Sequence, residues 1–318
     1  MSKSRPWKIF ALLIWLGGCG SPTQEQIITT VKPRIVASYS ILCELVSSIA
    51  AETVEMKCLI PPTESPHTYT PTPTDLKQIE QAQLILYGGY EFEPKIEQLI
   101  KNSQNNIPKV SIHSLAVPKP LLSQHEHETS HSHEEKLTAD PHIWHDVRNT
   151  IKMTKIIAEQ LSQVNPTQTN IYQTNSKELI IKLQKLDQWI KNQIATIPIE
   201  QRILVTTHEA FNYYAQAYGL KYLALLGLSS EETPSAAKIR QIVKSIKQSR
   251  VPTIFAEISA NDRVINTIAR EAKVKVAKQP LIADGLGIEE NTDTYIEVMV
   301  HNTCTIVEGL GGECKEFK

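Results

Sequence analysis

Short apolar runs and amphipathic segments alternate along the first half of the chain. The apolar runs favour buried strands at residues 34–39, 54–60, 84–89 and 109–113. Apolar side chains at three- and four-residue spacing favour helices at residues 41–52, 75–82 and 94–102. We expect Thr74 to cap the second of these helices. Strands that alternate with helices are typical of a parallel sheet.

The second half of the chain repeats this alternation. Further strands are expected at residues 202–208, 221–226, 253–258 and 275–282. Further helices are expected at residues 209–219, 235–249, 261–272 and 295–310. The aromatic residues within "FNYYAQAYG" have helical spacing, which indicates core packing rather than a ligand site.

A long helical segment separates the two halves. Leu179, Leu183, Leu186 and Ile190 recur at three- and four-residue spacing, and prolines bound the segment. The pattern predicts an α/β protein of two (β/α) parallel-sheet domains joined by one stiff linker helix. The expected ranges are an N-terminal domain at 34–165, the linker helix at 166–196 and a C-terminal domain at 197–318.

The N-terminus has the features of an export signal. Three basic residues precede the apolar run "IFALLIWLGG", which is too short to span a bilayer as a stable helix. The stretch "LGGC" resembles a bacterial lipoprotein signal, so we expect a signal peptide at 1–18, a lipidated Cys19 and a tether at 19–33. A signal peptide without lipidation is the alternative. Either way, a periplasmic or cell-surface location is expected.

Composition narrows the class of partner. The 318 residues include 41% hydrophobic side chains, which is typical of a globular protein with a core. Without the three basic residues of the signal, 30 basic and 34 acidic residues remain, a net charge of −4. No basic patch suggests binding to nucleic acid.

The remaining four cysteines suit an oxidising compartment. Three pairings are possible, and pairs close in sequence within one domain favour Cys43 with Cys58 and Cys304 with Cys314. Free buried thiols are the alternative. None of the four has the CxxC spacing of a redox or zinc motif.

Four potential metal ligands lie where strands end. His67 follows one predicted strand, His208 ends another, His142 lies in "DPHIWHD", and Asp284 follows a predicted strand in "ADGLG". Each alone could be an exposed histidine or a turn aspartate. Because ligands bind beyond the carboxyl ends of parallel strands, we expect the four to meet in a cleft between the domains. Three imidazoles and a carboxylate suit zinc.

These motifs resemble the cluster A-I solute-binding lipoproteins of ABC metal importers, the zinc and manganese receptors. The resemblance runs from about Arg34 to the C-terminus and rests on "PHTYTPTP", "DPHIW", a strand-end histidine before "AFNYY", and "ADGLG", in that order. It implies two domains bridged by a rigid helix with one metal ion between them. Carried over motif by motif, it also implies that His67, His142, His208 and Asp284 are the ligands.

The third ligand decides the expected cation. Manganese receptors of this family usually carry glutamate there and zinc receptors histidine, and this chain has "THEA". A shift by one residue would place Glu209 in the site instead of His208, and only one of the two can face it. Imidazole suits zinc, so we predict Zn²⁺ as the transported ligand, with Mn²⁺ or iron as the alternative.

A segment rich in histidine and acidic residues, 123–135, precedes the "DPHIW" motif. Zinc receptors of the family often carry such a loop. We expect its histidines to bind zinc weakly and transiently, unless the loop is merely solvated. We call these residues the loop histidines: His125, His127, His131 and His133.

Other polar residues are expected in supporting roles. His145 could join or replace His142, although packing or a role behind the ligands is favoured. Glu257 could hold a ligating imidazole by its second nitrogen or serve elsewhere as a cap or surface residue. His113 and His301 have no motif around them and are predicted to be structural.

The prediction is therefore a binding protein rather than an enzyme. We expect a lipid-anchored monomeric receptor that captures Zn²⁺ and delivers it to an ABC membrane permease. A zinc hydrolase is a remote alternative, since four protein ligands leave no open position for water. A surface adhesin of the same family would share the fold and the site.

Overall fold

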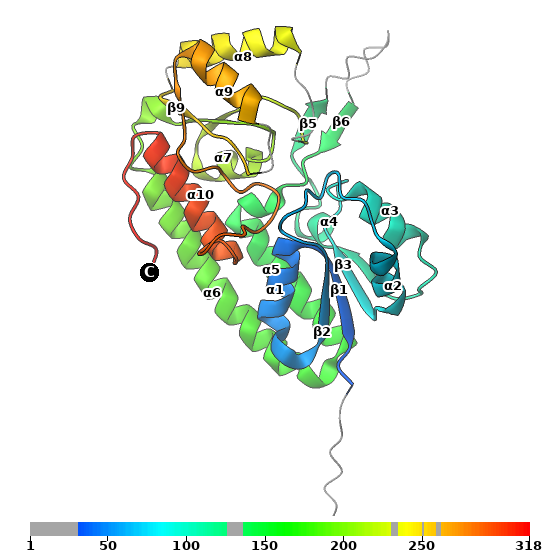
Figure 1. The fold of residues 1–318 in the computed structure, drawn as a ribbon. Coiled ribbons are helices and arrows are strands. Elements are labelled where there is room, and N and C mark those ends of the chain that lie inside the picture. The colour runs from blue at the N-terminus through cyan, green and yellow to red at the C-terminus, as the bar shows by residue number, and fades with distance from the viewer. Residues whose placement is uncertain (1–30, 126–135, 230–234, 250, 259–261) are drawn as a thin grey trace, which may run out of the picture. The chain divides into compact units, whose positions relative to one another are not determined.

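The first half of the chain builds a four-stranded parallel sheet (Figure 1). The computed structural model describes residues 31–125, 136–229, 235–249, 251–258 and 262–318. The strands lie in the order β2-β1-β3-β4. Their bounds are β1 (Arg34–Tyr39), β2 (Glu55–Ile60), β3 (Leu84–Tyr87) and β4 (Lys109–Ser111).

Helices cover both faces of this sheet. Successive side chains of a strand point to opposite faces, so each strand contributes to two cores. Ile35 and Ala37 pack with the core that includes helices α1 and α5, and Val36 packs with the core that includes α2 and α3. Figure 1 shows these helices on either side of the sheet. The helix bounds are α1 (Ser40–Ala50), α2 (Pro73–Gln81), α3 (Pro94–Asn102), α4 (Ile112–Ala116) and α5 (Val147–Val164).

The second half repeats the strand order of the first. β7 pairs with β8 and β9 with β10, all parallel, and a single bridge between Thr206 and Phe255 places β9 beside β7. The resulting order β8-β7-β9-β10 matches β2-β1-β3-β4. The bounds are β7 (Ile203–Thr206), β8 (Lys221–Ala224), β9 (Thr253–Ile254) and β10 (Lys275–Val276).

All four of these strands are shorter than predicted, and β9 and β10 are shortened most. Beyond β9, pairing continues only at single residues, such as the bridge between Glu257 and Leu281. Pro280 interrupts the strand predicted at residues 275–282, because proline has no backbone N–H to donate to the neighbouring strand. The chain stays extended enough to lead Leu281 back into the sheet, where its N–H donates to Ala256 O at 2.8 Å.

Helices cover both faces of the second set of strands. Val205 and Ile254 pack with α8 and α9, and Leu204 and Phe255 pack with the core that includes α10. The predicted aromatic helix is buried, which confirms its place in the core. The bounds are α7 (Asn212–Tyr218), α8 (Ala236–Ser249), α9 (Asp262–Ala272) and α10 (Tyr295–Gly309).

One helix of 26 residues, α6 (Thr169–Ile194), joins the two halves. It packs against α1 and α5 of the first half and against α10 of the second. Leu183, Leu186 and Ile190 are fully buried, as their spacing predicts. The predicted fold class, two parallel α/β halves with a long connecting helix, is confirmed. Residues 32–318 form one compact unit, and the domain boundaries at 166 and 197 stay a prediction.

The structure corrects the predicted cap of α2 and contains elements that were not predicted, among them a helix and a hairpin. Thr72 rather than Thr74 is the N-cap, because its hydroxyl accepts from Asp75 N while the Asp75 carboxylate accepts from Thr72 N. Helix α5 was not predicted, since Asn149, Thr150 and other polar residues interrupt its buried face. An antiparallel hairpin was also missed, formed by β5 (Leu122–His125) and β6 (Lys136–Ala139).

Four short 3-10 helices complete the described structure: η1 (Ala51–Thr53), η2 (Ile143–His145), η3 (Pro166–Gln168) and η4 (Ile199–Gln201). Among the described helices, none is both long and apolar enough to cross a membrane. The predicted signal peptide and Cys19 lie outside the described residues.

Both predicted disulfides are present. Cys43 of α1 bonds Cys58 of β2, with Cα atoms 5.7 Å apart. Cys304 of α10 bonds Cys314 of the C-terminal tail, with Cα atoms 5.2 Å apart. Each pair joins segments that are close in sequence, so each bond restrains a short loop of the unfolded chain.

Candidate metal centre

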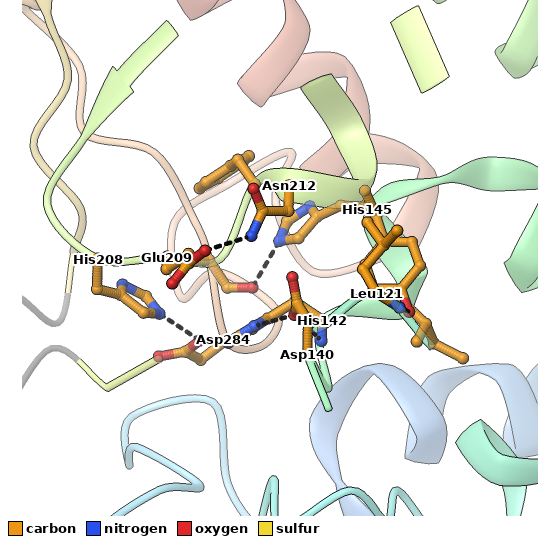
Figure 2. Close-up of polar contacts among 12 residues, drawn as sticks. Leu121, Asp140, His142, His145, His208, Glu209, Asn212 and Asp284 are labelled. Atoms are coloured by element: carbon orange, nitrogen blue, oxygen red, sulfur yellow. Dashed lines mark hydrogen bonds and ion pairs between the residues drawn. The ribbon is translucent and has the colours of Figure 1, made fainter. Parts of the chain in front are cut away.

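Three histidines and one aspartate converge in the interior. One donor atom of each of His67, His142, His208 and Asp284 lies within 4.8 Å of the other three. Asp284 Oδ1 lies 3.3 Å from Nε2 of both His142 and His208 and 3.6 Å from Nε2 of His67. Figure 2 shows His142 and His208 directed at Asp284. The structure thus brings together the four residues that the sequence analysis selects.

His67, His208 and Asp284 follow strands of the two parallel sets, and His142 follows the second strand of the hairpin. His67 lies in the loop between β2 and α2, and His208 lies two residues beyond β7. Asp284 follows the bridge at Leu281, and His142 lies between β6 and η2. Because parallel strands direct their carboxyl ends the same way, residues far apart in sequence meet at one point.

Asp140 fixes the orientation of His142. Its Oδ1 accepts hydrogen bonds from the backbone N–H and from the ring Nδ1–H of His142, both at 2.9 Å. The Nε2 lone pair therefore faces the cluster. Burial lowers the pKa of His142, but the hydrogen bond to Asp140 and the nearby carboxylates of Asp140 and Asp284 outweigh it and raise the pKa above its usual value.

Glu257 holds His208 in the same way. The Nδ1–H of His208 donates to Glu257 Oε2, while Oε1 accepts from the backbone N–H groups of Thr207 and His208 at 3.1 and 3.2 Å. Both side chains are fully buried. Burial lowers the pKa of His208, but the charges of Glu257 and Asp284 outweigh it and raise that pKa well above its usual value. Glu257 was expected from the sequence as a candidate for this position.

The donor atoms lack other partners. Within the described part of the chain, the two carboxylate oxygens of Asp284 and the Nε2 atom of His208 have no hydrogen-bond partner. Burial raises the pKa of Asp284, but the neighbouring charges of His208 and His67 hold it well below its usual range. Buried polar atoms without partners are costly, whereas a divalent cation among them would satisfy all at once. The donor set therefore fits a bound metal ion.

His67 differs from the other two histidines. Its side chain is 8% exposed, whereas those of His142 and His208 are fully buried. Phe92 packs edge-on against the ring, with centroids 5.1 Å apart. The pKa of His67 is lowered, mainly by burial. Its ring is therefore neutral near pH 7 and available to a cation.

Glu209, the alternative third ligand, lies outside the cluster. Its carboxylate accepts a hydrogen bond from Asn212 Nδ2 at 2.8 Å, and its backbone N–H donates to Gly227 O. Figure 2 shows Glu209 joined to Asn212, whereas His208 is joined to Asp284. The shift by one residue that would exchange Glu209 for His208 does not occur in this fold.

His145 supports the site without joining the cluster. Its Nε2–H donates to Ala283 O at 3.0 Å, directly before Asp284, and its ring stacks on Phe211. Burial lowers the pKa of His145 to about 3, which keeps the ring neutral. His113 and His301 bond Tyr39 and the backbone of Pro280, consistent with the structural roles expected for them.

The loop histidines fall largely outside the described residues. His125 is the last residue of β5 and pairs with Lys136 at the end of the hairpin next to residues 126–135. His127, His131 and His133 belong to the undescribed segment. Their predicted weak zinc binding stays a prediction.

Sequence reasoning missed Asp140. The residue stands two positions before His142 within "DPHIW", and that motif was used only to select the histidine. A carboxylate two residues before a candidate ligand is a usable signal, because it can accept from both the backbone N–H and the ring of that histidine.

Metal affinity is expected to fall as the pH falls. Protons compete with the cation for Nε2 of His142 and His208, whose pKa values are raised, while Asp284 stays ionised because its pKa is lowered. In the metal-free protein, a histidine with a raised pKa stabilises the fold below its unfolded pKa. This contribution is lost as the pH rises through the folded pKa. The difference in melting temperature between loaded and metal-free protein should therefore widen from about pH 6 to about pH 8.

Calorimetric titration in buffers of different ionisation enthalpy would measure this linkage. Proton release on metal binding is expected, and it should persist when the loop histidines are replaced by glutamine. A melting difference that stays constant with pH, together with no proton release, would contradict the coupling at His142 and His208.

The chain matches one protein-family model and is similar to several metal-binding lipoproteins. The family model for the zinc-uptake complex component A, periplasmic (ZnuA), matches residues 35–309. The chain is 29% identical over 303 residues to the manganese-binding lipoprotein MntA of Halalkalibacterium halodurans, covering 95% of this chain and 96% of that protein. It is 30% identical over 308 residues to the manganese ABC transporter substrate-binding lipoprotein PsaA of Streptococcus mitis, with the same coverages.

Two solved structures of metal-binding proteins have a similar fold. The periplasmic zinc-binding protein TroA of Treponema pallidum has a TM-score of 0.78 at 28% identity, covering 88% of this chain and 99% of that chain. Fe(III)-bound YtgA of Chlamydia trachomatis has a TM-score of 0.79 at 27% identity, covering 89% and 100%. The chain therefore belongs to the ZnuA family and is a substrate-binding component of a metal ABC transporter, a receptor and not an enzyme.

Proposed function

We propose that the chain captures Zn²⁺ outside the cytoplasmic membrane and delivers it to an ABC permease. The ligands are His67, His142, His208 and Asp284. The observation that carries the proposal is the convergence of their donor atoms within 4.8 Å of one another. Four protein ligands would surround the ion completely, as suits reversible capture rather than catalysis, which needs an open position for water.

The donor set is the reason for choosing zinc. Three imidazole nitrogens and one carboxylate match the ligands and the coordination number that zinc favours, whereas manganese favours more oxygen ligands. Because Glu209 faces Asn212, the third donor is His208 and the set contains a single carboxylate. The ion is cargo, so its binding must also be reversible at the permease.

Manganese is the second candidate, and one observation favours it. MntA and PsaA, both named for manganese, align along almost the whole chain. TroA is named for zinc and YtgA was solved with Fe(III), so the names of the relatives cover three metals. The donor atoms of this chain are therefore the basis of the preference for zinc.

The anchoring and delivery parts of the proposal rest on the sequence and on the relatives. MntA and PsaA are named lipoproteins. We extend this to a lipid on Cys19, which would hold a monomeric receptor at the membrane close to its permease. Intact mass of the exported protein would detect the lipid on residue 19.

A metal competition tests the choice of cation. The metal-stripped chain is incubated with an excess of zinc and manganese together, and the metal retained per chain is measured after removal of free ions. One zinc per chain is expected, both in the wild type and in a variant whose loop histidines are replaced by glutamine. Retention of manganese instead would establish the second candidate.

A further inference from the structure

A pocket of about 180 Å³ opens beside the metal centre. One wall is the turn at residues 62–65, directly before His67, and the other is the loop at 282–288, which contains Asp284. Ile258 completes the lining. The pocket thus lies between the loop that follows β2 and the loop that follows the bridge at Leu281.

This pocket lies on the more exposed side of the cluster. The side chains of His67 and Asp284 are 8% and 6% exposed, whereas those of His142 and His208 are fully buried. The pocket walls belong to the loops that carry the two less completely buried ligands. Of the four ligands, Asp284 is the one that lines the pocket, so a cation that approaches from solvent by this path meets it first.

The size of the pocket suits a hydrated ion. One water needs about 10–15 Å³ when volume is counted as space for the centre of a water-sized sphere, so about 180 Å³ on the same measure leaves room for a cation with a shell of about six waters. Small divalent cations bind a shell of about six waters in octahedral geometry. A pocket of this volume could hold the ion before water is exchanged for protein ligands.

The charge of the lining also suits a cation. Glu64 and Asp284 are acidic, and no lining residue is basic. Ile258, Ile282 and Ile288 supply apolar walls, which focus the field of the carboxylates. The Ser65 hydroxyl oxygen is buried and has no hydrogen-bond partner within the described structure. It is therefore an unsatisfied polar atom of a residue that lines the pocket.

We propose that this pocket is the access route of the metal ion, with Glu64 as the outer residue that attracts the hydrated cation. The Ser65 hydroxyl binds a water of its shell, and Asp284 then exchanges water for carboxylate oxygen. Glu64 is exposed and is not one of the four ligands. This inference rests on the proposed function of the four-residue site, and it adds the direction from which the ion enters.

Association kinetics test the route. The metal-stripped chain is mixed with Zn²⁺ in a stopped-flow instrument, and a fluorescent zinc indicator reports the free ion. The loop histidines are replaced by glutamine throughout. Glu64→Gln is expected to lower the association rate constant about three- to tenfold at low salt, with a smaller effect at high salt. Ile288→Arg, which adds a positive charge to the pocket, should lower it further.

Matched controls lie on α6, away from the pocket. Glu178→Gln removes the same charge, and Ile181→Arg adds the same cation at an exposed isoleucine. Both should keep the wild-type rate, and all variants should retain one zinc per chain. Equal rates in Glu64→Gln, Ile288→Arg and their controls, with one zinc still bound, would overturn the route alone. Failure of the unmodified chain to retain any metal would instead overturn the proposed function.

Discussion

Replacing His208 by alanine is expected to lower zinc affinity by about two to three orders of magnitude. Four-ligand zinc sites bind with about 10–16 kcal/mol, so each ligand contributes about 3 kcal/mol on average, and 1.4 kcal/mol is tenfold in affinity. His208 is also the ligand that Glu257 holds in place, so its loss leaves a buried carboxylate without its ring partner. Competition with a chelator of known zinc affinity would measure the change.

Glu209→Ala is the matched control for this substitution. Glu209 is adjacent to His208 in sequence, but its carboxylate bonds Asn212 rather than facing the cluster. Its removal should leave zinc affinity within about twofold of the wild type. If Glu209→Ala abolished tight binding while His208→Ala did not, the ligand set would be wrong and manganese would become the favoured cargo.

The second large effect is expected for Glu257→Gln. This change keeps the size of the side chain but removes the charge that faces His208 Nδ1, and one amide cannot accept from all three N–H donors that Glu257 serves. Loss of such a partner behind a metal ligand costs about 10- to 100-fold in affinity. Titration of the variant with zinc would show a reduction in that range, with one site per chain retained.

Proton NMR separates this positioning role from general destabilisation. In the wild type, the Nδ1 proton of His208 should give a strongly downfield resonance because it is shared with a buried carboxylate. The resonance should move upfield in Glu257→Gln and stay unchanged in Glu209→Gln. Unchanged affinity and an unchanged resonance in Glu257→Gln would show that Glu257 does not act on the site through His208.

The fold was largely predictable because its elements have simple periodicities. The predicted strand at 34–39 and the predicted helix at 94–102 agree with the structure to the residue. Helix α5 was missed because Asn149, Thr150 and Thr154 are buried on its inner face and break the apolar stripe. The strand predicted at 253–258 pairs with the segment at 275–282, which contains Pro280. The break in pairing therefore could not be predicted from the sequence of residues 253–258 itself.

The candidate site was predictable for a different reason. Parallel strands gather their carboxyl ends, so His67, His208 and Asp284 could be grouped from strand order alone. The choice between His208 and Glu209 needed the direction of the chain beyond β7, which a linear pattern does not contain. Asp140 was missed because its role depends on ring geometry within one short motif.

The measurement that tests the central claim most directly is anomalous X-ray diffraction from crystals loaded with zinc. Data collected on either side of the zinc absorption edge would locate the ion without reference to its ligands. One strong anomalous peak is predicted, within bonding distance of Nε2 of His67, His142 and His208 and of a carboxylate oxygen of Asp284. Zinc found only at the loop histidines, with these four donors unoccupied, would contradict the account.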